Sequence, residues 1–499
     1  MLYVVLLCLW PVLTYVQENF EKLNGFWEVF LIASVMVFLG LSFVKLVDTK
    51  RRKLPHAYLF FLLAGIALFF NYVVCVDFFV NPYVKASYLW GGIGLVILGV
   101  AWQISSRPMV QQIIKPVILV LFFFPSLSIL PAQFFSKKVT FPSVEEKEEF
   151  VLKHKPNIYY FLVDGYARQD TLKEVARFDN EPFLKKMEEE GFLVSRNAYS
   201  NYHFTGASLS STMNMHYHRM VDGLIPYPPM GESLKGDNLV RKILRNNGYK
   251  IINIPAHWHQ MGGYGYEDVC IKNNAFEIYE SFLSATPLRA LNWKNHYVSN
   301  EDVMGVMGLF PESPKFIFAH FAQIHDAIYD ENGEFVSVLH PALSNYENSR
   351  RYVHSVSAMN QKLLELVDHI RKKDPQAVVI IQADHGPTYT GSQEMGDPSY
   401  WVQNNDAFRL RSSKDHRYVF GILSAIYLPE YDSPVGDKVR SYFSGHLTLI
   451  NVFRGVFSYL SHAKTLNLLK DDSHFLYMDE QAGVYREVDI EMFKKRICS

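Results

Sequence analysis

The chain has 499 residues, enough for more than one domain, and 49% of them are hydrophobic. Lysine and arginine (49) nearly balance aspartate and glutamate (50), so the composition offers no general attraction for nucleic acid, and we expect no nucleic-acid partner. The four cysteines lack CxxC spacing, which argues against a zinc knuckle and a disulfide framework. Whether Cys270 and Cys498 pair or remain thiols stays open.

Five apolar stretches in the first quarter predict a domain of five transmembrane helices over residues 1–135. Several approach the roughly 20 residues that cross a bilayer core, although the first and fourth are shorter. Basic residues follow the second stretch (50–53) and the fourth (Arg107, Lys115), so the positive-inside rule places everything after the fifth stretch outside the cytoplasm. If one short stretch does not cross, the rest of the chain lies in the cytoplasm. The stretches are 2–16, 26–47, 57–80, 88–104 and 113–134.

The remainder of the chain predicts a soluble domain joined to the first by a polar segment. Residues 136–155 read as a linker or an interfacial helix at the membrane exit. In residues 156–499, helices alternate with apolar strands, which is typical of a doubly wound α/β domain. We expect strands at 157–163, 249–254, 315–319, 378–381 and 418–427, and helices at 169–191, 237–247, 351–373 and 447–460.

Polar side chains follow two of these strands at their carboxyl ends. Asp164 follows the first, and Asp384 and His385 follow the apolar run that begins at Val378. A parallel sheet brings its carboxyl ends to one edge, where open α/β sheets bind ligands. Thr205, in a hydroxyl-rich turn that enters a helix, adds one more oxygen. The three residues that offer oxygen and the one histidine nitrogen suit zinc or manganese. A structural role is the alternative for Thr205, which would then be a helix N-cap.

The order of Asp164, Thr205-x-x-Ser208 and Ala383-Asp384-His385-Gly386 resembles the alkaline phosphatase/sulfatase superfamily. The five spans in front narrow the resemblance to the branch that holds lipoteichoic acid synthases, phosphoethanolamine transferases and phosphoglycerol transferases. It implies an alkaline-phosphatase-like catalytic domain. It also implies one divalent cation, zinc or manganese, whose ligands are Asp164, Thr205, Asp384 and His385, with Thr205 as the nucleophile.

Two departures from the family patterns are informative. These transferases commonly use glutamate as their first acidic ligand. Asp164 instead matches the pattern of phosphatases and sulfatases. Sulfatases carry C/S-x-P-S-R at the nucleophile, whereas this chain has Thr205 and Leu209 at the two ends of that pattern. Sulfate-ester hydrolysis is therefore disfavoured.

Further residues are candidates for substrate binding and for a second metal. The resemblance implies that His257 with Trp258, His325 and Ser208 contact substrate, although His257 and His325 are otherwise ordinary loop histidines. The segment after His325 resembles the PH-x-P-(F/Y) segment of related transferases without its prolines. Asp326 and His446 are candidates for the second site of a two-metal phosphatase. We expect His320 to be structural.

The resemblance implies a phosphotransferase anchored in a bacterial cell membrane, with its catalytic domain outside the cytoplasm. Such an enzyme moves phosphoethanolamine or phosphoglycerol from a phospholipid donor to a surface glycan or glycolipid through a phospho-threonine intermediate. Two alternatives remain: a sulfatase-like hydrolase, acting as a phosphodiesterase or a sulfuric ester hydrolase, and an inactive membrane protein that binds glycans.

Overall fold

The computed structural model divides the chain into two units, Met1–Ser136 with Asn274–His296, and Lys137–Asn273 with Tyr297–Ser499. The residues that it describes are 1–19, 27–48, 57–72, 86–105, 107–135, 150–174, 176–218, 231–256, 266–271, 286–288, 297–329, 335–338, 345–387, 418–470, 472–479 and 484–487.

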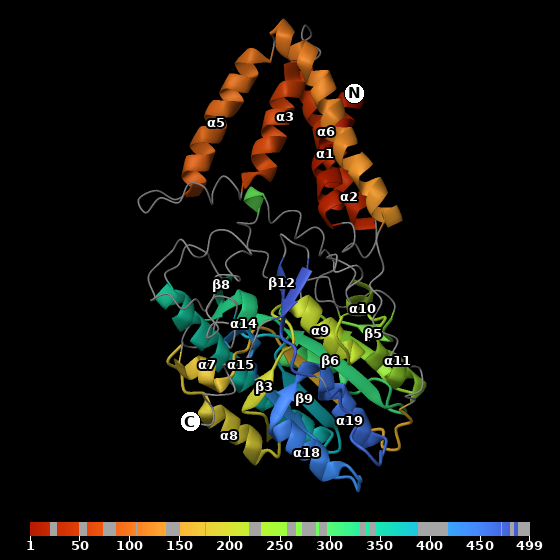
Figure 1. Ribbon diagram of the computed structural model, residues 1–499. Coiled ribbons are helices and arrows are strands. Elements are labelled where there is room, and N and C mark those ends of the chain that lie inside the picture. The colour runs from red at the N-terminus through yellow and green to blue at the C-terminus, as the bar shows by residue number, and fades with distance from the viewer. Residues whose placement is uncertain are drawn as a thin grey trace. The chain divides into compact units, whose positions relative to one another are not determined.

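The first unit is helical, and the described part of each predicted apolar stretch forms mainly a helix (Figure 1). Helix α1 packs against α2 and α6, and apolar side chains such as Leu95 and Phe124 are exposed. Of the described helices, two are long and apolar enough to cross a membrane, over Val29–Leu46 and Pro108–Leu127. The other three are shorter, so the five spans remain a prediction. The helices are α1 (Leu2–Asn19), α2 (Trp27–Asp48), α3 (Ala57–Phe70), α5 (Ala86–Ile104) and α6 (Pro108–Phe135).

The second unit is built on a sheet that has seven strands within the described residues, in the order β2-β10-β9-β1-β6-β4-β5. The middle of the sheet is parallel, but β10 runs antiparallel to both β9 and β2, so the sheet is mixed rather than wholly parallel. The strands are β1 (Ile158–Val163), β2 (Leu193–Val194), β4 (Lys250–Ile254), β5 (Val269–Cys270), β6 (Lys315–Phe321), β9 (Val378–Gln382) and β10 (Ser424–Tyr427).

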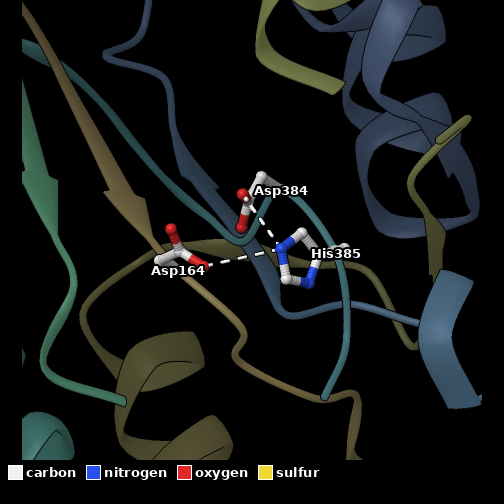
Figure 2. Close-up of side chains that lie close together, drawn as sticks. All are labelled: Asp164, Asp384 and His385. Carbon is white, nitrogen blue, oxygen red and sulfur yellow. Dashed lines mark ion pairs between the residues drawn. The ribbon is translucent and has the colours of Figure 1, made fainter. Parts of the chain in front are cut away.

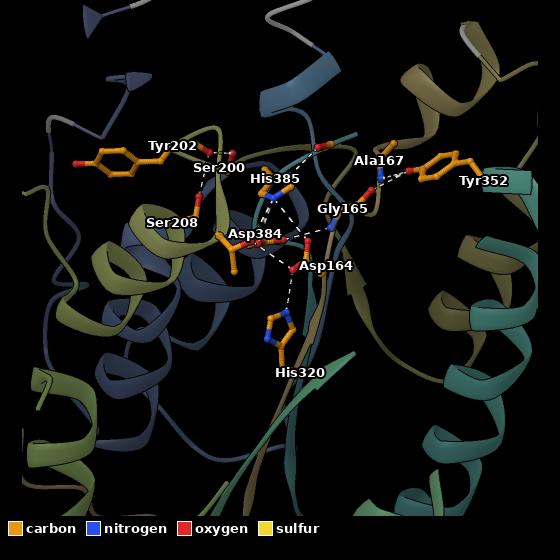
Figure 3. A network of polar contacts seen from close by, with 12 residues as sticks. Asp164, Gly165, Ala167, Ser200, Tyr202, Ser208, His320, Tyr352, Asp384 and His385 are labelled. Atoms are coloured by element: carbon orange, nitrogen blue, oxygen red, sulfur yellow. Dashed lines mark hydrogen bonds and ion pairs between the residues drawn. The ribbon is translucent and has the colours of Figure 1, made fainter. Parts of the chain in front are cut away.

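Three central strands are buried along their whole length, as near-continuous apolar runs predict for parallel strands that are covered on both faces. Tyr160 of β1 packs edge-on against Phe453 of α19 (Val452–Leu460). Figure 3 shows the helix that carries Tyr352, α15 (Asn345–Lys373), on one side of the strands and the helix that carries Ser208, α9 (Thr205–Asn214), on the other.

The remaining elements of this unit are short. Three two-stranded pairings join β3 (Asn197–Tyr199) to β11 (His446–Thr448), β7 (Ala327–Tyr329) to β8 (Phe335–Val338), and β12 (Leu476–Asp479) to β13 (Val484–Glu487). The other helices are α7 (Gln169–Glu174), α8 (Glu181–Glu189), α10 (Gly231–Lys235), α11 (Leu239–Asn246), α13 (Asn300–Val306), α14 (Gln323–Asp326), α18 (Gly436–Ser444) and the 3₁₀ turn η5 (Leu449–Asn451).

Four predicted elements differ from the structure. The helix expected at 169–191 is split into α7 and α8, because Arg177 adopts a left-handed conformation and Pro182 opens a new helix. The strand expected at 418–427 begins only at Ser424. The helix expected at 447–460 starts with a strand and a 3₁₀ turn. Strand β6 runs past residue 319 and includes His320.

Candidate metal centre and active site

The two aspartates meet because their strands are neighbours in register. In the pairing of β1 with β9, Leu162 lies opposite Gln382, and two more residues in the same register bring Asp164 beside Asp384. Both carboxylates are buried. Gly165 turns the chain immediately afterwards with a φ of 72°, a conformation that glycine adopts without strain. Its N–H donates to Asp384 Oδ1 at 3.3 Å, which links the two strand ends.

His385 is oriented by the carbonyl of the next residue. Its Nδ1 lies 2.7 Å from the Gly386 carbonyl oxygen, and because a carbonyl only accepts, Nδ1 carries the proton. In this tautomer, Nε2 carries the lone pair and is the ring atom that binds a cation. Nε2 lies 3.6 Å from Asp164 Oδ1 and 3.5 Å from Asp384 Oδ2, the two contacts drawn in Figure 2.

Gly386 holds this arrangement because only glycine fits there. A Cβ at this position would lie 2.1 Å from the Tyr418 carbonyl oxygen and about as close as contact allows, 3.0 Å, to that of Gly421. The Gly386 N–H donates to the Val419 carbonyl at 2.6 Å. The segment 418–421 therefore fixes the peptide group whose oxygen orients His385.

Thr205 brings a hydroxyl to the same point from the first residue of α9. The helix N-cap is Phe204, so the N-cap alternative for Thr205 is wrong. Thr205 Oγ1 lies 3.3 Å from Asp164 Oδ2 and 3.3 Å from His385 Nε2. The first N–H groups of a helix have no acceptor within it, so this end of α9 can also receive an anion such as a phosphoryl group.

The gathered groups fit a divalent cation. Ligand atoms of Asp164, Asp384 and His385 lie within 4.8 Å of one another, and all three residues are buried. Within the described residues, Asp384 Oδ2 accepts no hydrogen bond. Buried carboxylates that face each other and an imidazole lone pair are unfavourable unless a positive charge joins them. Oxygen and imidazole ligands together suit zinc or manganese.

The charge of the site affects a buried tyrosine beside it, Tyr160. Burial, and then the nearby charge of Asp384, raise the pKa of Tyr160 above its ordinary value, so the phenol remains protonated. Its oxygen accepts a hydrogen bond from Gln382 Nε2 at 3.1 Å. Tyr160 therefore stabilises the end of β9 through a neutral hydrogen bond and adds no charge to the site.

His320 contacts the centre, although we expected only a structural role. Its Nε2 lies 2.9 Å from Asp164 Oδ2, and the ring is buried. It stands on β6, the neighbour of β1, opposite Leu162. A hydrogen bond of this kind orients a metal-binding carboxylate. The signal for this contact in the sequence was a histidine in a buried strand whose other residues after Lys315 are all apolar.

Two buried polar residues hold the first turn of α9 rather than facing the metal ligands. The Ser208 hydroxyl donates to the Tyr202 carbonyl at 2.9 Å, which leaves its predicted contact with substrate a prediction (Figure 3). His218 Nε2 lies 3.1 Å from the Ala207 carbonyl oxygen. Burial lowers the pKa of His218 to about 4, so this ring is neutral at pH 7. Both contacts fix the helix that presents Thr205.

The remaining predicted site residues do not join this group of side chains in the described part of the chain. His446 lies 3.2 Å from the Asn197 amide nitrogen and joins no group of metal-ligating side chains among the described residues. His325 and Asp326 follow β6 in α14, but their side chains lie outside the description, as do His257, Trp258 and Cys498. The second metal site and the substrate histidines remain predictions.

A comparison with family models covers the part of the chain that forms this site. The family model described as Sulfatase matches residues 156–417, which include Asp164, Thr205, Asp384 and His385. No curated protein matches the chain.

Similar solved structures include the C-terminal periplasmic domain of EcEptC from Escherichia coli, with 12% identity, a TM-score of 0.43, and coverage of 66% of this chain and 91% of that one. The lipooligosaccharide phosphoethanolamine transferase EptA from Neisseria meningitidis has 11% identity, a TM-score of 0.42, and coverage of 94% and 97%. The lipoteichoic acid synthase LtaP from Listeria monocytogenes has 10% identity, a TM-score of 0.37, and coverage of 68% and 80%.

Proposed function

The chain belongs to the sulfatase family of enzymes, and from that membership we propose that it is a membrane-anchored, metal-dependent phosphotransferase. It moves a phosphoethanolamine or phosphoglycerol headgroup from a phospholipid to a glycan or glycolipid on the outer side of a bacterial membrane. The observation that carries the proposal is the position of the Thr205 hydroxyl, 3.3 Å from both Asp164 Oδ2 and His385 Nε2 at the start of a helix.

The nucleophile favours phosphoryl transfer over sulfate-ester hydrolysis. Sulfatases convert a cysteine or serine to an aldehyde, and threonine cannot give an aldehyde because its Cβ carries a methyl group. At the arginine position of the sulfatase pattern stands Leu209, which is buried and cannot pair with an anion. A threonine hydroxyl can instead attack phosphorus directly.

The reaction follows a two-step exchange at phosphorus. The Thr205 oxygen attacks the phosphodiester in line, the bond from phosphorus to the diacylglycerol oxygen breaks, and diacylglycerol leaves with a proton. An acceptor hydroxyl then attacks the phospho-threonine, gives up its proton, and restores Thr205. A divalent cation held by Asp164, Thr205, Asp384 and His385 supplies positive charge that favours an ionised hydroxyl and offsets phosphoryl charge.

The residues of the chain divide the remaining tasks. Asp164 accepts the hydrogen bond of Thr205 and is itself held by His320. The first N–H groups of α9 receive phosphoryl oxygens. In this proposal His257 or His325 gives the proton to the departing diacylglycerol, as a general acid.

The apolar N-terminal helices support membrane anchoring. Two of the described helices, α2 and α6, are long and apolar enough to span a bilayer. A phospholipid donor and an anchored enzyme share one surface, which raises their rate of encounter. We place the catalytic unit outside the cytoplasm, where surface glycans lie.

The proposal is tested with full-length protein in vesicles that contain headgroup-labelled phospholipid. Thr205→Ala should abolish label transfer, whereas Thr205→Ser should retain part of it. Thr212→Ala is a matched control, because Thr212 is a buried threonine of the same helix whose hydroxyl donates to the Ser208 carbonyl at 2.7 Å.

The products separate the alternatives. Transfer at the wild-type rate in Thr205→Ala would end the proposal. Release of free headgroup phosphate at equal rates with and without a glycan acceptor would identify a hydrolase. A protein that neither transfers nor releases label with zinc or manganese present would be a binding protein.

A further inference from the structure

Helix α15 contacts the turn that follows β1 through a buried tyrosine hydroxyl. Tyr352 Oη accepts a hydrogen bond from the Ala167 N–H at 2.9 Å and donates one to the Gly165 carbonyl at 2.9 Å (Figure 3). Tyr352 is 4% exposed and Ala167 is 1% exposed. Both backbone groups are therefore shielded from bulk water, and the Tyr352 hydroxyl is a hydrogen-bond partner of each.

The same face of α15 holds the residue between these two. The Tyr166 hydroxyl donates to Asn360 Oδ1, and it accepts from Asn180 Nδ2 at 2.8 Å. Asn360 Nδ2 closes the ring by donating to Asn180 Oδ1 at 2.7 Å. Tyr352 and Asn360 are eight residues apart, about two helical turns, so they lie on one face of the helix. α15 thus fixes three consecutive residues of the turn.

The turn needs this support because it carries two groups of the metal centre. Asp164 precedes it, and the Gly165 N–H donates to Asp384 Oδ1 at 3.3 Å. Before a cation binds, the two carboxylates and the imidazole lone pair repel one another, and that repulsion pushes the turn away from Asp384. Hydrogen bonds on the far side of the turn oppose the movement.

We propose that Tyr352 is a positioning residue of the metal centre. Its hydroxyl holds the 165–167 turn so that the Asp164 carboxylate and the Gly165 N–H meet Asp384 in the geometry that binds the cation. In this proposal Tyr352 acts through Gly165 and Asp164 rather than as a ligand of the metal. The inference rests on the proposed function in one respect, which is that a divalent cation occupies the site.

A matched pair of variants tests the role. Tyr352→Phe keeps the buried ring and removes only the hydroxyl. Tyr459→Phe removes a hydroxyl that likewise joins two backbone groups elsewhere in the unit. Tyr459 Oη accepts from the Tyr431 N–H at 2.9 Å and donates to the Pro429 carbonyl at 2.7 Å, and it also accepts from Arg440 Nη2 at 3.4 Å. Both tyrosines are buried, so the two variants should lose similar thermal stability.

The measurement is the affinity of full-length protein for Zn²⁺ and Mn²⁺ by competition with a chelator, together with kcat and KM for the phospholipid. Tyr352→Phe should bind metal about 10-fold more weakly and lose kcat without a change in KM, because partners outside the ligand set typically control affinity by this factor. Tyr459→Phe should keep wild-type affinity. Melting curves of the same samples check that both variants fold.

Two results overturn the inference alone, and a third overturns the proposed function together with it. Equal metal affinity in Tyr352→Phe and wild type would show that the hydroxyl does not position the ligands. Equal losses in Tyr352→Phe and Tyr459→Phe would show a general effect of stability. A wild-type protein that binds neither metal would instead overturn the proposed function, and the inference with it.

Discussion

Replacing Asp384 by asparagine should raise the stability of the metal-free protein and change that of the metal-loaded protein little. The ligand atoms of Asp164, Asp384 and His385 are buried and lie within 4.8 Å of one another. Asparagine keeps the shape of the side chain and the oxygen that accepts from the Gly165 N–H, but it carries no charge. Asp384→Asn therefore relieves repulsion in the metal-free protein while it removes a metal ligand.

The two effects are of similar size. Two like charges 4.8 Å apart repel by about 3 kcal/mol at an effective dielectric constant near 20. A cation at about 100 times its dissociation constant stabilises the wild type by about 2.7 kcal/mol, whereas the variant gains little. The metal-free wild type should therefore unfold roughly 5 °C below the variant, and added metal should close most of that gap.

The assay is thermal unfolding of the full-length protein in detergent, with a chelator and then with saturating Zn²⁺ or Mn²⁺. Asp472→Asn is the control, because the Asp472 carboxylate accepts from Thr448 Oγ1 at 2.8 Å and Asn451 Nδ2 at 2.9 Å rather than facing another carboxylate. It should lose stability equally in both conditions. If Asp384→Asn unfolds below the wild type in chelator, the argument from carboxylate repulsion is refuted.

Three further predictions follow from single contacts. Gly386→Ala should cost about 3 kcal/mol of stability and weaken metal binding, since its Cβ would lie 2.1 Å from the Tyr418 carbonyl oxygen. Gly305→Ala is the control, because a Cβ there meets nothing in the described chain within 4 Å, and it should lower neither stability nor metal affinity in the same assays. Because burial lowers the pKa of His218 to about 4, the unfolded state binds more protons between about pH 6.5 and 4. The contribution of His218 to the free energy of unfolding should be fully present above pH 6.5 and should fall by roughly 3 kcal/mol as the pH drops to 4. His218→Gln should therefore flatten this part of a plot of melting temperature against pH. His320→Leu should lower metal affinity and kcat about 10-fold because Asp164 loses its partner, and unchanged values would contradict that role.

The sequence was most informative where two buried strands end in acidic residues. The apolar runs before Asp164 and Asp384 predicted parallel strands, and parallel strands share a carboxyl edge. Their adjacency depends on strand order, which no local pattern contains. Thr205 was included as a hydroxyl in a turn that enters a helix. This signal is weak because such hydroxyls have many structural uses, and the family resemblance strengthened it. The roles of these residues in catalysis remain predictions.

What the sequence did not predict depends on tertiary contacts. The helical spacing of α15 shows that Val356 and Met359 face the core, but it cannot show which hydroxyl reaches the turn at Gly165. An apolar pattern likewise carries no strand direction, so the antiparallel β10 was not foreseen. The break between α7 and α8 had a signal, Pro182, that the charged helical pattern concealed.

The central claim is that the Thr205 oxygen forms a bond to the phosphorus of a phospholipid headgroup. Mass spectrometry of full-length protein, incubated with a defined phospholipid in the absence of acceptor, tests it directly. We expect a phospho-alcohol adduct on the peptide that contains Thr205, absent from Thr205→Ala and discharged when acceptor glycan is added. Headgroup transfer that proceeds with an adduct on another residue, or with none, would contradict it.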